Sequence, residues 1–405
     1  MTANPVTFSP SELLVAARED CVSVVELVRA LVQATSRGGI DSYDEVLDVV
    51  CGWLRARKLP VRLLSDESNT VVGVCCEIRG RLPGPQWVLN ACLDTAPFGD
   101  ECAWTHGPTS AYVEDDWMWG RGTSDSKVGA AIFCHLAARI APVVQSMSGS
   151  LTILLDADEH TGKFGGARQY FEDLEAPTDV AGVMIGYPGL ANLIVGGRGV
   201  HRVRFRVHGV ASHSGARIPT SNAIVKAAQL VSILSSAEMP TRLTSEFPFP
   251  PKLTVTELRG GESYSITPDL AIVAVDARTT PAADGLFFDN LFHSAALTID
   301  RAWADTRATV IEVDTEWPPY YTNDSDPMRR ALLSAASALG IDLEPKISGM
   351  SNIGNYLAGL GIPATAGFGV EYEGLHATDE RINLRTISTV QAVYHAAVLR
   401  LLRSS

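Results

Sequence analysis

The sequence has little positive charge. Its 405 residues include 33 Lys and Arg against 46 Asp and Glu, which leaves a formal net charge of −13 at pH 7. Proteins that bind nucleic acid or an anionic membrane surface need clusters of basic side chains, and no long Lys/Arg run occurs here. We therefore expect no nucleic-acid partner and no membrane partner.

Paired cysteines and long hydrophobic runs are also missing. The seven cysteines are scattered without a Cys-x-x-Cys pair, a usage typical of reduced thiols. The longest apolar segment, residues 128–144, contains His135 and Arg139, which favours a buried helix over a membrane span. The first ten residues contain no Lys or Arg, so we expect no secretory leader. Together these absences indicate a cytoplasmic protein.

The order of apolar patterns predicts an α/β fold. Apolar residues recur at helical spacing over residues 11–58, which predicts a helical opening. Short β-branched and aliphatic runs then alternate with helical segments; the runs are residues 71–78, 87–93, 151–155 and 181–185. This alternation is typical of a mostly parallel sheet flanked by helices on both faces.

A second, smaller domain is predicted to begin near residue 196. There the apolar residues Val203, Phe205 and Val207 alternate with arginines, as in a half-solvated antiparallel strand. Helices near residues 222–236 and 287–303, with strands between them, predict an inserted α+β domain. Because Pro318-Pro319 cannot continue a helix or a strand, we expect the chain to return there. The predicted segments are residues 1–195, 196–313 and 314–405.

Acidic and histidine clusters follow the predicted strands. Asp94 follows residues 87–93, Asp158-Glu159-His160 follows residues 151–155, and His376 lies near the end of the chain. Reactive groups of open α/β sheets gather at the carboxyl ends of strands, so one polar site is predicted. Each residue alone has a structural alternative: Asp125 could cap a helix, and His376 could be a surface histidine.

Taken together, the motifs resemble the M20 metallopeptidase and amidohydrolase family, which includes aminoacylases, glutamate carboxypeptidases, acetylornithine deacetylases and succinyl-diaminopimelate desuccinylases. The segments that carry the resemblance are Gly120-Arg121-Gly122-Thr123-Ser124-Asp125-Ser126-Lys127, Asp158-Glu159-His160-Thr161-Gly162, Gly209-Val210-Ala211-Ser212-His213-Ser214 with Asn222-Ala223-Ile224, Asp276-Ala277-Arg278 and His376-Ala377-Thr378-Asp379-Glu380. The resemblance implies that residues 1–195 and 314–405 form a catalytic domain and that residues 196–313 form a lid or dimerisation domain.

For the site, the resemblance implies two zinc ions bridged by an aspartate, a glutamate general base and a second aspartate that orients a ligand. Asp125 falls at the bridging position, Glu159 at the base and Asp94 at the orienting position. Zinc lowers the pKa of its water toward about 7, and a neighbouring carboxylate can then move the proton.

Three ligand positions depart from the family pattern. They hold Cys92 in place of a histidine, His160 in place of a glutamate and Tyr187 in place of an acidic residue. Asp125, His160 and His376 could still hold one zinc ion, whereas a thiol and a phenol predict an absent or weak second site. The alternative for Cys92 is a small buried strand residue, as is usual for a free cysteine, and Tyr187 could donate a hydrogen bond instead of binding metal.

The inserted domain keeps residues that the resemblance links to substrate. His213 matches a histidine that reaches a neighbouring subunit, which implies a homodimer, and Arg278 matches an arginine that binds a substrate carboxylate. Asn222 and Gly349 match further substrate contacts, although Asn352 stands where an aspartate is usual. The alternatives are a salt bridge between Arg278 and Asp276 and a loop hydrogen bond for His213.

We expect a metal-dependent hydrolase that cleaves the amide bond of a small N-acyl amino acid or dipeptide-like substrate. Two alternatives stay open. One is a metal-poor enzyme that forms amides, transfers acyl groups or rearranges its substrate in a specialised biosynthetic pathway. The other is a ligand-binding protein without turnover.

Overall fold

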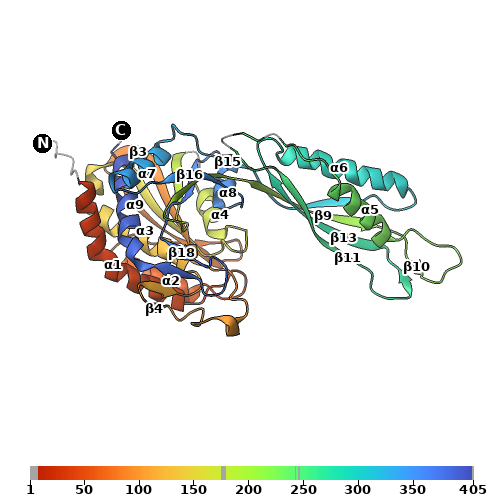
Figure 1. The fold of residues 1–405 in the computed structure, drawn as a ribbon, viewed down its shortest axis with the longest axis horizontal. Helices are drawn as coiled ribbons and strands as arrows, with labels where there is room; N and C mark the ends of the chain where they lie inside the picture. Colours follow the sequence, from red (N-terminus) through yellow and green to blue (C-terminus); the bar gives the residue numbers. More distant parts are fainter. Residues whose placement is uncertain (1–7, 175–178, 242, 245–246, 404–405) are drawn as a thin grey trace. The chain divides into compact units, whose positions relative to one another are not determined.

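The computed structural model describes residues 8–174, 179–241, 243–244 and 247–403, which form two compact units (Figure 1). Unit 1 comprises residues 1–196, 321–346 and 360–405, and unit 2 comprises residues 197–320 and 347–359. Residues 1–7, on which the expectation of no leader partly rests, lie outside the described residues. Of the helices that the structure describes, none has the length and apolar character needed to cross a bilayer.

The main sheet of unit 1 has a parallel centre and antiparallel edges. Its strands follow the order β1-β2-β6-β3-β7-β17-β8, and β15 and β16 pair with β8. The neighbours β6, β3, β7 and β17 run parallel, whereas β1 with β2, β2 with β6 and β17 with β8 are antiparallel. The bounds are β1 Arg62–Ser65, β2 Val71–Arg79, β3 Leu82–Cys92, β6 Ser148–Asp156, β7 Val180–Ile185, β8 Asn192–Gly197, β15 Tyr320–Tyr321, β16 Glu344–Ser348 and β17 Ala364–Gly367.

Helices cover both faces of this sheet (Figure 1), so the predicted α/β fold is confirmed. The strand β6 is buried along almost its whole length, which explains why its sequence is continuously apolar. The helix α3 packs on β3 and β6, and α4 packs on β2 and β6. The bounds are α1 Pro10–Gln33, α2 Asp44–Ala56, α3 Val128–Ile140, α4 Gly165–Glu172, α7 Pro327–Ala338 and α9 Ile387–Leu401.

The predicted helical opening is confirmed, and α1 begins at a local sequence signal. The Ser9 side chain accepts a hydrogen bond from the Glu12 backbone N–H, and the Glu12 carboxylate accepts one from the Ser9 backbone N–H. Pro10 occupies the first turn, where its missing N–H costs no hydrogen bond. Buried positions then recur every three or four residues and place one apolar face of α1 against α3 and α9.

A small second sheet in unit 1 brings two distant segments together. Its order is β18-β19-β5-β4, with bounds β4 Tyr112–Glu114, β5 Trp117–Trp119, β18 Tyr372–Glu373 and β19 Arg381–Asn383. Strands of two or three residues are too short to show a period in the sequence. Because Arg381 pairs with Trp119, the segment that contains His376 lies beside the segment that begins at Gly120.

Unit 2 is an antiparallel sheet with helices on one face, as predicted. The strand order is β11-β13-β9-β14, and along β13 buried residues alternate with half-buried ones. The buried face packs on α5 and α6 through one apolar core. The bounds are β9 Gly199–His208, β10 Ser212–His213, α5 Ala223–Ser235, β11 Lys252–Gly260, β12 Ile266–Thr267, β13 Leu270–Thr279, α6 Gly285–Ala302, β14 Val310–Trp317 and α8 Ile353–Gly359.

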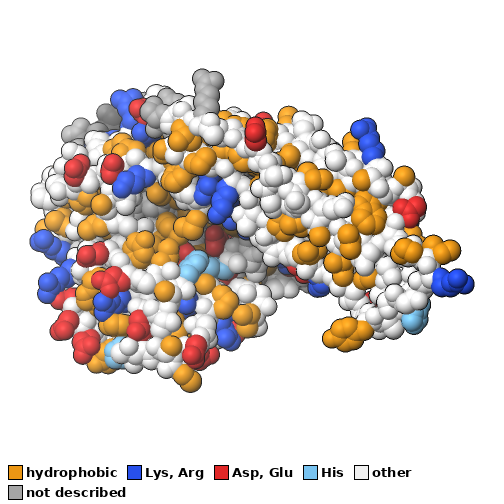
Figure 2. Space-filling model, turned by 45° about the vertical axis from the view of Figure 1, so that its right-hand side comes forward, with side chains coloured by type: hydrophobic (Ala, Val, Ile, Leu, Met, Phe, Trp, Pro, Cys, Tyr) orange, Lys and Arg blue, Asp and Glu red, His pale blue; other side chains and the backbone are white. Residues whose placement is uncertain are grey.

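Two features of unit 2 escape the apolar pattern. The edge strand β14 is not predicted, because acidic residues occupy alternate positions. Two of these residues pair with arginines of β9, as Asp314 does with Arg204 at 3.2 Å. Hydrophobic side chains also remain on the outer surface of unit 2 (Figure 2), among them Val225 on α5 and Leu286 and Leu297 on α6.

Candidate functional site

The carboxyl ends of β3, β6 and β7 bring the first candidate residues together. Cys92 is the last residue of β3 and pairs with Asp156, the last residue of β6. The turn that contains Glu159 and His160 follows β6, and Tyr187 follows the end of β7 at Ile185. Because these strands are parallel neighbours, their ends meet at one edge of the sheet, as the sequence predicts.

Asp125 enters this edge from a loop that is anchored by buried charges. The Glu380 carboxylate accepts hydrogen bonds from the backbone N–H groups of Gly122 and Ser124, both at 3.0 Å, and from the Ser124 hydroxyl at 2.7 Å. It also forms a buried ion pair with Arg121, 2.6 Å long. At the other end of the loop, the Lys127 ammonium donates to the carbonyl oxygens of Leu31 and Ala34.

The anchored loop places the Asp125 carboxylate among three possible metal ligands. Its Oδ1 lies 3.7 Å from the Cys92 sulfur, and its Oδ2 lies 3.7 Å from Nε2 of His160 and 3.0 Å from Nε2 of His376. Cys92, Asp125 and His160 each offer one ligand atom, and these three atoms all lie within 4.8 Å of one another. The Asp125 carboxylate therefore contacts these possible ligands and does not cap α3, the helix that follows.

The environment of the His160 imidazole suits a bound cation, because its ring nitrogens lack close hydrogen bonds. Its side chain is 6% exposed, and neither ring nitrogen has a hydrogen-bond partner. The nearest oxygens, on Glu159, Asp94 and Asp125, are 3.4–3.7 Å away, too far for good hydrogen bonds. A buried imidazole without a hydrogen-bond partner, beside a thiol and a carboxylate, is a donor set that suits zinc.

The pKa shifts of Asp125 and Cys92 describe the electrostatics of the cluster. Burial opposes the charge of Asp125, but His160 and His376 lower the pKa of this carboxyl below its usual range. Burial and the charge of Asp125 raise the pKa of the Cys92 thiol. A bound dication would reverse the second effect, because a coordinated thiol loses its proton.

Glu159 and Asp94 lie beside this cluster in different roles. Asp94 is fully buried and accepts hydrogen bonds from the backbone N–H groups of Glu159, at 3.1 Å, and His160, at 2.7 Å. It thus positions the turn that contains both residues. Burial and the charges of Asp125 and Asp94, opposed by His160, raise the pKa of Glu159 to about 8. A carboxyl poised near neutral pH is suited to accept and return a proton.

Tyr187 is a poor metal ligand in this setting. Burial and the charges of Asp125 and Glu159 raise the pKa of its phenol above the usual value. The group therefore stays protonated at neutral pH and is available as a hydrogen-bond donor.

Arg278 and Gly349 lie together in unit 2. The Arg278 guanidinium binds Asp276, with Nε 2.7 Å from Oδ1, and its Nη1 contacts the Ser351 hydroxyl at 3.3 Å. Arg198, which sequence reasoning did not single out, donates from Nε to the Gly349 carbonyl at 2.9 Å. Burial and the charge of Arg278 lower the pKa of Arg198. The only sequence signal for Arg198 is its place in the Gly-Gly-Arg-Gly turn.

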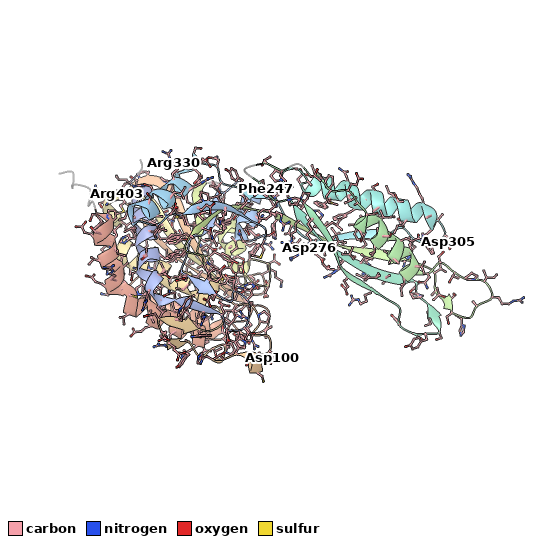
Figure 3. All side chains as sticks on the ribbon, in the orientation of Figure 1. Asp100, Phe247, Asp276, Asp305, Arg330 and Arg403 are labelled. Atoms are coloured by element: carbon pink, nitrogen blue, oxygen red, sulfur yellow. The ribbon has the colours of Figure 1, made fainter. Side chains whose placement is uncertain are left out.

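His213 lies at the opposite end of unit 2 from Arg278. It pairs with Ile266, just before β13, whereas Arg278 is near the end of β13. The eight residue steps along β13 from Leu270 to Arg278 span about 26 Å. Figure 3 labels Asp276 and Asp305 at these two ends. His213 is exposed, and its Nδ1 accepts from the Gly215 N–H at 3.1 Å.

Asn222 caps the helix α5. Its Oδ1 accepts from the backbone N–H of Ile224 at 2.8 Å, an arrangement that stabilises a helix start. A separate contact with substrate would have to use its amide NH₂ group.

The chain is similar in sequence and fold to known proteins. A family model described as peptidase family M20/M25/M40 matches residues 88–400. A succinyl-diaminopimelate desuccinylase of Cereibacter sphaeroides is 24% identical over 314 residues, which cover 76% of this chain and 80% of that protein. Another, from Psychrobacter arcticus, is 25% identical over 320 residues, 76% of each chain.

Solved structures share the fold. A tripeptidase from Staphylococcus aureus superposes with a TM-score of 0.70 at 18% identity, covering 95% of this chain and 98% of that one. A dinuclear metal-binding peptidase from the M20 family of Bacillus subtilis superposes with a TM-score of 0.69 at 16% identity, covering 95% of this chain and 99% of that one.

Proposed function

The chain belongs to peptidase family M20/M25/M40, whose members are metal-dependent amide hydrolases, and from this premise we propose that it cleaves the amide bond of a small N-acyl amino acid or dipeptide-like substrate with one zinc ion. The observation that carries the proposal is the convergence of Asp125, His160 and His376 beside the partly buried carboxyl of Glu159. The desuccinylase relatives support an N-acylated, carboxylate-bearing substrate.

Asp125, His160 and His376 would hold the ion. When bound, zinc lowers the pKa of water toward about 7 and polarises a carbonyl oxygen. The ionised Asp125 supplies a negative charge to the ion, and the two imidazoles supply nitrogen ligands. The protonated phenol of Tyr187 argues against a strong second site.

Glu159 would act as the general base. Its carboxylate accepts the proton of the attacking water and returns it to the leaving nitrogen, so that the amine departs neutral. Asp94 holds the backbone of Glu159 and His160 and thereby keeps the base next to the ligand. A cation at Asp125 would lower the pKa of Glu159 below its metal-free value of about 8.

Arg278 would bind the carboxylate of the substrate. An arginine presents two parallel N–H groups that match a carboxylate, and Asp276 holds this guanidinium in a defined orientation. The Gly349 backbone and the Asn222 amide would add polar contacts.

His213 would act in the active site of a partner subunit, in a homodimer. Two observations support this. His213 and Arg278 are separated by the length of β13, so His213 and Arg278 of one unit 2 cannot contact the same small substrate. In addition, exposed apolar side chains such as Leu286 and Leu297 remain on the helices of unit 2.

A mixing experiment tests the shared site. Subunits with His213→Ala and subunits with Glu159→Gln should each be inactive alone, and mixing them should restore about a quarter of the wild-type activity. Random pairing makes half of the dimers mixed, and each mixed dimer has one intact site. Steady-state rates, with native mass spectrometry to count mixed dimers, measure this. Mixed dimers without activity would show that the active site is not shared between subunits and that His213 does not act in a partner's site.

Metal analysis tests the function itself. Protein purified without chelators should contain about one zinc ion per chain, and chelation should abolish amide hydrolysis until zinc is restored. Activity that survives complete removal of metal would contradict the proposal.

That contrary result would favour a second candidate, a metal-poor enzyme that transfers acyl groups or forms amides. The observation behind it is the substitution of two ligand positions by Cys92 and Tyr187, with Arg278 retained. Its product would be a new amide or ester, detected by mass spectrometry with an added amine acceptor.

A further inference from the structure

Cys92 occupies the buried side of the candidate metal site. It is 4% exposed at the end of β3, and its sulfur lies 3.2 Å from the Ser126 hydroxyl and 3.7 Å from Oδ1 of Asp125. His376, in contrast, has a half-exposed side chain and approaches the other oxygen, Oδ2. The two residues therefore flank the carboxylate on opposite sides.

The spacing of these atoms is close to that of ligands around one ion. Zinc bonds of about 2.0 Å to nitrogen or oxygen and about 2.3 Å to sulfur, at tetrahedral angles, place ligand atoms about 3.3–3.5 Å apart. The sulfur of Cys92 is 3.7 Å from Oδ1 of Asp125, and Nε2 of His160 is 3.7 Å from the other oxygen, Oδ2. One ligand atom from each of Cys92, Asp125 and His160 lies within 4.8 Å of the others, so a contraction of roughly 1 Å would give the spacing of ligands around one ion.

An independent observation points to a ligand here. Both nitrogens of the His160 ring are buried without a hydrogen-bond partner, an arrangement that is costly unless something binds there. Asp94 lies 3.5 Å from Nδ1 of His160. In metal sites such a carboxylate commonly orients the ring so that the other nitrogen faces the ion. Nε2 is therefore the nitrogen available to the cluster.

We propose that Cys92 is a thiolate ligand of the same ion that Asp125 and His160 hold, so that a single sulfur-containing site replaces two separate sites. This inference rests on the proposed function, which requires an ion at Asp125. It assigns Cys92 to the ion itself, whereas the sequence offered it as part of a second, weak site or as a structural residue.

The comparison with Cys134 separates a ligand from an ordinary buried cysteine. Cys134 is also fully buried, on α3, but the other ionisable groups near its thiol are two cysteines and Arg57. The thiol of Cys92 faces a carboxylate and an imidazole at ligand distances. Both thiols have the volume of a small apolar residue, and packing alone accounts for Cys134. The carboxylate and imidazole beside Cys92 indicate a ligand role in addition to packing.

A thiolate predicts which metals the site prefers. Together with the Asp125 carboxylate it neutralises a dication, and sulfur favours zinc, cobalt and cadmium over magnesium and manganese. The added negative charge also weakens the pull of the ion on a substrate oxygen. The hydrolase should thus depend more on Glu159 than a site made only of imidazoles and carboxylates would.

Cobalt titration of metal-free protein tests the ligand without using activity. Wild-type protein should bind one Co²⁺ per chain and show an intense near-ultraviolet band from sulfur-to-cobalt charge transfer. Cys92→Ser should lose that band and weaken binding by more than the roughly 10–100-fold expected for an outer partner. The matched variant Cys134→Ser should keep both the band and the affinity.

Zinc-edge X-ray absorption of wild-type protein provides a second test that needs no variant. One sulfur at about 2.3 Å among nitrogen and oxygen neighbours supports the inference. A zinc or cobalt ion bound without sulfur overturns it and leaves the metal-dependent hydrolase intact. Wild-type protein that binds neither metal overturns the inference and the proposed function together.

Discussion

Replacing Glu159 with glutamine should reduce amide hydrolysis by about 10²–10⁴-fold, the usual contribution of a general base, while metal and substrate still bind. Glutamine has nearly the same volume and keeps the backbone N–H that donates to Asp94 at 3.1 Å. It cannot accept and return a proton. The loss should therefore fall on kcat rather than on the dissociation constant of the substrate.

The measurement compares steady-state rates and calorimetric binding for the N-acyl amino acid that the wild-type enzyme hydrolyses fastest. The control is Glu172→Gln, an exposed glutamate on α4 that pairs with Arg168, which should leave the rate unchanged. A Glu159→Gln enzyme with wild-type kcat would remove Glu159 from the mechanism. A reduced metal content of the Glu159→Gln variant would show instead that the Glu159 carboxylate helps to hold the ion.

Replacing Arg121 with methionine should lower the free energy of unfolding of unit 1 by about 3–5 kcal/mol, the cost of leaving one partner of a buried ion pair alone. The side chains of Arg121 and Glu380 are 2% and 0% exposed. Glu380 would keep its backbone partners at Gly122 and Ser124 but would lose its counter-charge. Chemical denaturation followed by circular dichroism measures the change.

The same substitution should also weaken metal binding. Arg121 donates to the carbonyl of His376 at 3.2 Å. Its partner Glu380 accepts hydrogen bonds from the loop that contains Asp125. The exposed pair Arg168 and Glu172 is the control, because Arg168→Met should cost less than about 1 kcal/mol. Equal losses in the two variants would mean that the buried pair is no more important than a surface one.

The elements of both units could be predicted wherever one face or both faces of an element are buried. The helix α1 and the strands β6 and β13 show the periods that their burial requires. The strand β14 and the small sheet that includes β5 and β19 could not be predicted, because an acidic edge strand and three-residue strands bury too little to leave a period.

Part of the candidate site could be predicted from the sequence, and part could not. Asp125, His160 and His376 could be named from their motifs, yet the sequence left Asp125 open as a helix cap and Cys92 as a buried strand residue. Their roles depend on which atoms face each other, such as the Cys92 sulfur and Oδ1 of Asp125. Arg121 and Glu380, 259 residues apart, show no sign of their pairing in the linear order.

The sequence by itself determined the architecture, the family and the residue types that can hold a cation, because apolar periodicity and motif spacing are local properties of the chain. Only the tertiary structure decided that the thiol of Cys92, the carboxylate of Asp125 and the ring of His160 share one small volume, and that Asp94 holds the turn of Glu159. The physical reason is that these contacts join strand ends and loops that are distant along the chain. Their distances depend on how the parallel strands align and on the buried charges that anchor the loop between Gly120 and Lys127.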